Sequence, residues 1–141
     1  MKKCFEDEFV DVQSGLISLC LELTEEVVGV DKVYAFAYNE RKSKSFNAFF
    51  EVNGEVKTMG KMNELSHELI TEFLKIGTDD LEKIEKICDR YERPVPVIME
   101  MIYDVKTGSF DAHYQYEPLP EDVCSDEIFL DWISKMENKK K

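Results

Sequence analysis

The chain has 141 residues, and its 30 Asp and Glu against 18 Lys and Arg give a formal net charge of −12 at pH 7. This length predicts one domain spanning residues 1–141, and a hydrophobic content of 43% excludes a disordered chain. So negative a surface repels phosphate backbones and anionic lipid headgroups. We therefore expect a cationic partner, and neither nucleic acid nor a membrane.

The four cysteines, at positions 4, 20, 88 and 124, include no C-x-x-C pair. Scattered thiols in a chain that can build its own core indicate a reducing compartment rather than a disulfide framework. Acidic residues follow Lys2 and Lys3 where a signal peptide would be apolar, and no apolar run approaches the ~20 residues of a membrane-spanning helix. We therefore expect a cytoplasmic protein.

Two segments have the spacing of amphipathic helices. Residues 9–28 carry apolar side chains at steps of three and four, and Gly29 is placed to end that helix. Residues 62–92 have the same spacing, but residues 77–80 combine a glycine, a threonine suited to an N-cap and two acids. Both two helices and one bent helix fit this segment, which ends before the prolines of residues 93–96.

Residues 33–38 and 45–52 alternate in residues that favour β-structure, and they predict two strands. A third strand follows Asn53 and Gly54. A three-residue loop with a bulge at Gly54 would place Val56 beside Phe50, whereas a two-residue turn would place charged residues there. We therefore predict the bulged loop.

Two further strands, residues 97–104 and 110–117, flank a turn at residues 105–108. A last helix is expected to begin at Ser125, with two acids in its first turn. Its apolar stripe consists of Ile128, Phe129, Trp132, Ile133 and Met136.

The expected order is α-β-β-β-α(α)-β-β-α. Short strands joined by tight turns predict an α+β single domain with about five antiparallel strands and with the helices on one face of the sheet.

Catalytic and metal-binding patterns are scarce. Glu64 and His67 have the i, i+3 spacing of di-iron bundles, but such a site needs a second pair and further carboxylates. Cys88 lies on an apolar helical stripe, and the six glycines build no phosphate-binding loop. We expect no catalytic residue, no metal and no cofactor, and hence a protein that is not an enzyme.

The most distinctive segment is residues 117–131, which contains six acidic residues and neither lysine nor arginine. It can be a solvated rim with favourable charges at a helix start, or a patch that meets a basic surface. If the segment is a patch that meets a basic surface, the candidate partner-binding residues lie on it and on the preceding strand. They are Asp111, His113, Gln115, Glu117, Glu121, Asp122 and Asp126.

Residues 99–132 read MEMIYDVKTGSFDAHYQYEPLPEDVCSDEIFLDW. They contain a YD-x-KTG-x-F hairpin, a Y-x-YE-x-L strand end and a late helix with a central tryptophan. These features, together with the upstream order of elements, resemble the YezG-like immunity proteins, which are bacterial antitoxins. The resemblance implies a protein that binds and neutralises a cognate toxin domain, such as a nuclease domain, by steric and electrostatic blocking. A small cytoplasmic binding or regulatory adaptor without catalysis is the alternative.

Overall fold

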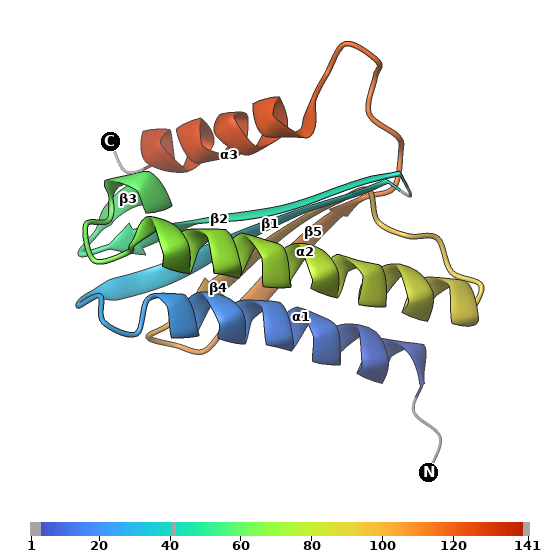
Figure 1. Cartoon of the computed structure of the whole chain (residues 1–141), viewed down its shortest axis with the longest axis horizontal. Helices are drawn as coiled ribbons and strands as arrows, with labels where there is room; N and C mark the ends of the chain where they lie inside the picture. Colours follow the sequence, from blue (N-terminus) through green and yellow to red (C-terminus); the bar gives the residue numbers. More distant parts are fainter. Residues whose placement is uncertain (1–3, 41, 140–141) are drawn as a thin grey trace.

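The computed structural model describes residues 4–40 and 42–139. In chain order it contains α1 (Phe5–Leu23), β1 (Val30–Glu40), β2 (Ser43–Val52), β3 (Glu55–Thr58), a 3₁₀ turn η1 (Met59–Lys61), α2 (His67–Arg90), β4 (Ile98–Asp104), β5 (Phe110–Gln115) and α3 (Ser125–Lys139) (Figure 1). The predicted α+β fold and its order of elements are confirmed.

The five strands form one antiparallel sheet in the order β3-β2-β1-β4-β5. The long strand β1 lies at the centre, where Ala35 pairs with Ala48 of β2 on one side and with Met101 of β4 on the other. The sheet therefore has two edges, β3 and β5, and β5 is the longer of them.

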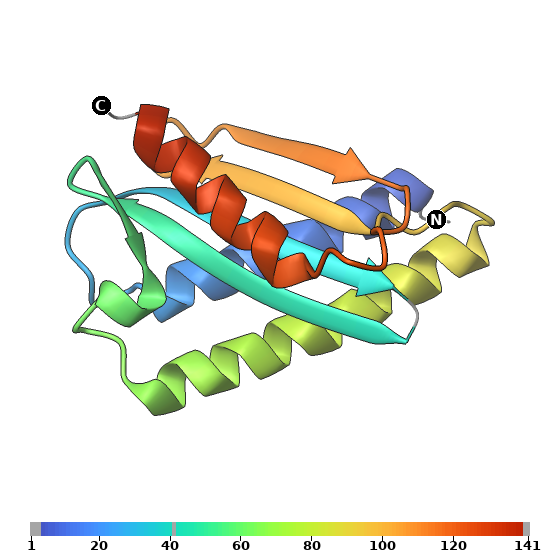
Figure 2. The same ribbon diagram turned by 90° about the horizontal axis from the view of Figure 1, so that it is seen from above.

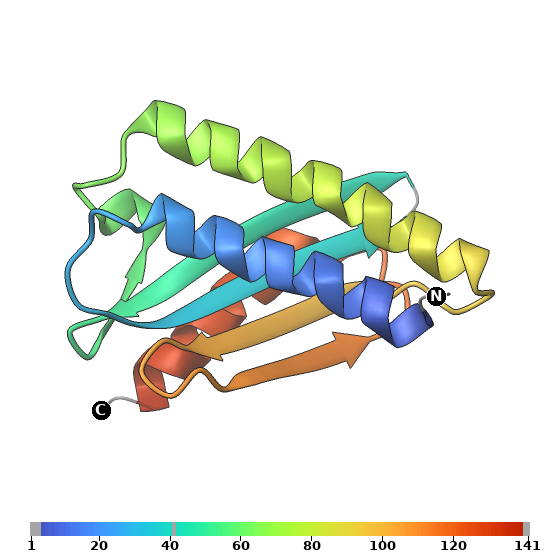
Figure 3. The same ribbon diagram turned by 90° about the horizontal axis from the view of Figure 1, so that it is seen from below.

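The helices cover both faces of the sheet. α1 and α2 lie side by side on one face, and α3 crosses the other face diagonally (Figures 1, 2 and 3). The prediction that all helices share one face is therefore wrong for α3. The reason lies in β1, which is apolar on both sides: Val33, Ala35 and Ala37 face α1 and α2, while Tyr34 and Phe36 face α3.

The two faces bury two separate cores. Leu16, Cys20, Leu81 and Ile84 of α1 and α2 pack on the first face and are fully buried. Aromatic rings dominate the second core, where Tyr34 stacks on Phe49 with ring centroids 4.4 Å apart. Trp132 of α3 meets Phe49 edge-on at 5.0 Å. The tryptophan of the last helix is thus its main anchor on the sheet.

The helix boundaries differ from the predicted ones. α1 begins at Phe5 and ends at Leu23, so the apolar residues 27 and 28 lie beyond it. Gly29 has a φ of 89°, but it shapes the turn into β1 and does not end the helix. α2 is one continuous helix of 24 residues with Gly77 inside it, which decides between the two alternatives for residues 62–92.

The turn between β2 and β3 also differs from the predicted bulged loop. Val52 pairs with Glu55, so Asn53 and Gly54 form a two-residue turn in which both residues have positive φ, 50° and 81°. The predicted bulge would place Val56 beside Phe50, but Phe50 pairs with Lys57. Val56 instead packs against the second core, on the face covered by α3.

Candidate functional site

The candidate residues on β5 form one row on the face of the sheet that α3 covers in part. Asp111 pairs with Ile102, His113 with Glu100 and Gln115 with Ile98. Ile98 and Ile102 belong to the core beneath α3, and cross-strand partners share a face. Asp111 and His113 are exposed, and Gln115 is half-buried.

The remaining candidates lie on the linker between β5 and α3 and at the start of α3, where all of them are exposed. The linker arches away from the end of the sheet (Figure 1). Glu40 of β1 holds it, because its Oε1 accepts a hydrogen bond from the backbone N of Leu119 at 3.2 Å, and the Leu119 side chain packs against the second core. We call the exposed acids of this linker and of the first turns of α3 the acidic rim: Glu117, Glu121, Asp122, Asp126, Glu127 and Asp131.

The charge of the acidic rim is largely uncompensated. Asp131 pairs with Lys135 one turn further along α3, with Oδ2 and Nζ 3.3 Å apart. Within residues 4–40 and 42–139, no lysine or arginine forms an ion pair with any of the other five acids. The rim therefore presents its negative potential to the solvent, where it can attract a positively charged surface.

Glu100 links the row on β5 to α3, and sequence reasoning missed it. Burial raises the pKa of this half-buried carboxyl group, and Asp131 raises it further, while His113 and Lys135 lower it. These interactions place the middle of α3 near Glu100 on β4, which pairs with His113 of β5. The available signal was a glutamate between the apolar residues of β4, on the same side as Ile98 and Ile102.

Among the described residues, no group of three or more His, Cys, Asp or Glu side chains could hold a metal ion. His67 is the first residue of α2, whereas Glu64 lies before the helix, so the i, i+3 pair has no helical geometry. Cys88 is buried, and burial raises the pKa of its thiol to about 11, which keeps it protonated and unreactive at neutral pH.

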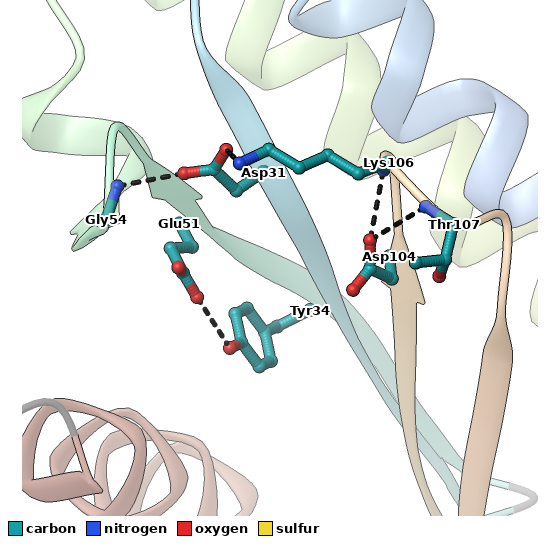
Figure 4. Close-up of polar contacts among 7 residues, drawn as sticks. All are labelled: Asp31, Tyr34, Glu51, Gly54, Asp104, Lys106 and Thr107. Atoms are coloured by element: carbon teal, nitrogen blue, oxygen red, sulfur yellow. Dashed lines mark hydrogen bonds and ion pairs between the residues drawn. The ribbon is translucent and has the colours of Figure 1, made fainter.

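A second polar cluster lies at the end of the sheet where three turns meet (Figure 4). Asp31 accepts a hydrogen bond from the backbone N of Gly54 through Oδ2 at 2.8 Å, and its Oδ1 lies 3.1 Å from Nζ of Lys106. Oδ1 of Asp104 accepts hydrogen bonds from the backbone N of Lys106 and of Thr107, at 3.0 and 3.1 Å. Both Asp31 oxygens are engaged, so this cluster fastens the turns to one another. The Lys106-Thr107-Gly108 segment is accordingly a structural turn.

The same view shows Glu51, an acid that is buried (Figure 4). Its Oε2 accepts a hydrogen bond from the hydroxyl of Tyr34 at 3.4 Å. Burial, and next the negative charge of Glu51, raise the pKa of Tyr34 to about 12. The tyrosine therefore remains a neutral donor at physiological pH and stabilises the buried carboxylate.

The chain matches no model of a known protein family and no curated protein. No helix within the described ranges is both long enough and apolar enough to cross a membrane.

Proposed function

We propose that this chain is a YezG-like immunity protein that acts in the cytoplasm. It binds a cognate, positively charged toxin domain, such as a nuclease domain, and blocks it sterically and by charge. It needs no cofactor and binds neither nucleic acid nor a membrane directly.

The observation that carries this proposal is the uncompensated acidic rim. Six exposed acids gather on one linker and the adjacent helix start, and only Asp131 has an ion-pair partner among the described residues. Complementary charge raises the rate of association and selects the partner. A nuclease domain has a basic surface because it must bind phosphates, so an acidic protein that covers this surface would exclude the substrate. The resemblance of residues 99–132 to the YezG-like family supports the same partner class.

The test is co-expression with the toxin domain encoded beside this chain. We expect the wild-type chain to restore growth and the double variant Glu121→Lys/Asp122→Lys to restore it poorly, because the variant reverses two charges at the centre of the rim. Binding of the purified pair should weaken in parallel.

Glu25→Lys/Glu26→Lys is the matched control. It makes the same change of charge at two exposed acids after α1, at the end of the molecule opposite the linker (Figure 1). This control should restore growth as the wild type does. If neither variant affects rescue, the rim is not the binding surface. If the wild type rescues growth from no neighbouring toxin, the alternative of an adaptor module without catalysis gains support.

A further inference from the structure

The open edge of β5 is suited to pair with another strand. β5 is the last strand of the sheet, and none of the other described helices or strands covers its outer side (Figures 2 and 3). Exposed edges are templates for pairing because their backbone groups lack partners. The opposite edge, β3, has only four residues.

The register shows which backbone groups of β5 point outward. Asp104 N donates to Ser109 O at 2.9 Å, and Val97 N donates to Gln115 O at 2.7 Å, so residues 109 and 115 turn their backbone groups toward β4. Backbone groups alternate in direction along a strand. The N–H and C=O groups of Phe110, Ala112 and Tyr114 therefore point away from the sheet.

The side chains of the same three residues lie on the α1 side of the edge. Ala112 and Tyr114 pack against the first core, and the Tyr114 hydroxyl accepts a hydrogen bond from Nε2 of Gln13 in α1 at 2.7 Å. Phe110 is 44% exposed and Tyr116, just beyond the strand, is 50% exposed. Phe110 lines a mostly apolar hollow of about 300 Å³ between α1 and the β4–β5 hairpin, together with the exposed Val10 of α1.

We propose that β5 pairs antiparallel with β5 of a second copy of this chain, with the two-fold axis at Ala112. In this register Ala112 faces Ala112, and Phe110 faces Tyr114 of the second copy. The outward N–H and C=O groups of Ala112 then form two hydrogen bonds, one from each copy. The two sheets become one continuous sheet of ten strands, from the five strands of each copy.

The side chains on the α3 side of β5 favour this register among those that the backbone allows. On the α3 side, Asp111 of each copy faces His113 of the other, which pairs a carboxylate with an imidazole twice. A shift of two residues in one direction would set Asp111 against Asp111, and in the other direction His113 against His113. The edge is thus complementary to itself only when it is centred on Ala112.

This dimer engages Asp111 and His113 of the candidate residues, but it does not involve the acidic rim, which carries the proposed function. The acidic rim lies on the linker and α3, outside the paired strands, so both rims remain accessible. The two interactions also respond oppositely to salt. Added salt screens the repulsion between two chains of net charge −12 and should strengthen the dimer, whereas it should weaken the binding of a cationic toxin.

Sedimentation equilibrium of the full chain over a range of concentrations and salt tests the dimer. We expect a monomer–dimer equilibrium that salt shifts toward the dimer. Ala112→Pro removes the outward N–H group and no bond to β4, so it should weaken the dimer about tenfold or more. Far-UV circular dichroism of this variant checks that the fold is kept. A chain that stays monomeric at all concentrations overturns the proposal.

Cysteine cross-linking tests the register without destabilising the edge. The exposed Cys4 and Cys124 are first replaced by serine, and the buried Cys20 and Cys88 are kept. Ala112→Cys should then form an intermolecular disulfide on oxidation, because facing Cα atoms in a hydrogen-bonded pair lie about 5.5 Å apart. Gln115→Cys is the control, since the two copies of residue 115 would lie roughly 20 Å apart. Equal cross-linking of both variants, or of neither, overturns the pairing of β5 with itself.

Discussion

At the scale of single residues, two glycines inside helices have very different surroundings. Gly77 of α2 lies directly over the ring of Phe46 in β2, so that a Cβ atom added there would overlap the ring. Gly15 of α1 is exposed, and an added Cβ would meet nothing within 4 Å. Gly77 therefore allows a close approach of α2 to the sheet, while Gly15 makes no contact that requires a glycine.

Alanine at these two positions should have opposite effects. Gly15→Ala should stabilise the fold by about 1 kcal/mol, because alanine favours the helix and fits the space. Gly77→Ala gains the same propensity but must displace Phe46, and overpacking of this kind costs about 1–3 kcal/mol, so we expect no gain or a net loss of stability. Urea unfolding of both variants measures the difference.

Phe46→Leu provides the check on this explanation. Combined with Gly77→Ala, it should cost less than the sum of the two single changes, because the smaller side chain makes room for the new methyl group. Strict additivity would show that Phe46 is not the source of the strain.

At the scale of elements, α3 depends on a small number of aromatic contacts. Trp132 is 5% exposed and packs against Phe49 and Tyr34. Leu130, two residues away on the same helix, is 60% exposed. The helix has one strongly buried face, and the three acids of the rim that belong to α3 are exposed: Asp126, Glu127 and Asp131.

Trp132→Ala should destabilise the protein by about 3–5 kcal/mol, since it removes the largest side chain between α3 and the sheet. Leu130→Ala is the matched control and should change stability by no more than about 0.5 kcal/mol. Circular dichroism during urea unfolding measures both. Similar effects of the two substitutions would mean that α3 is not anchored through its tryptophan.

At the scale of the whole molecule, the net charge of −12 dominates long-range interactions. Steering by this charge acts over the Debye length, which is about 8 Å at physiological ionic strength. Its effect falls on the rate of encounter more than on the rate of dissociation.

We therefore predict that the association rate with a cationic toxin domain falls steeply as salt is added, while the dissociation rate changes little. Glu121→Lys/Asp122→Lys should slow association further at low salt and flatten its salt dependence. Stopped-flow or surface-binding kinetics across ionic strength measure both rates. An association rate that does not change with ionic strength would exclude electrostatic steering by the rim.

The sequence by itself determined the types and order of the elements, the turn at residues 105–108 and the acidic character of residues 117–131. These features are local, because they depend on the spacing of apolar side chains, on glycine and proline, and on charge along the chain. It also identified Trp132 as part of the apolar stripe of the last helix.

Only the tertiary structure decided which face each element covers. β1 and β2 are apolar on both sides, so alternation could not assign α3 to a face, and it misled the prediction of the turn at Asn53 and Gly54. Local rules predict that a helix ends at Gly77. α2 nevertheless continues through Gly77, because the close packing of the helix against Phe46 outweighs the weak helical propensity of glycine. The neighbours of Glu100 and the open edge of β5 likewise follow from long-range pairing, which no local pattern contains.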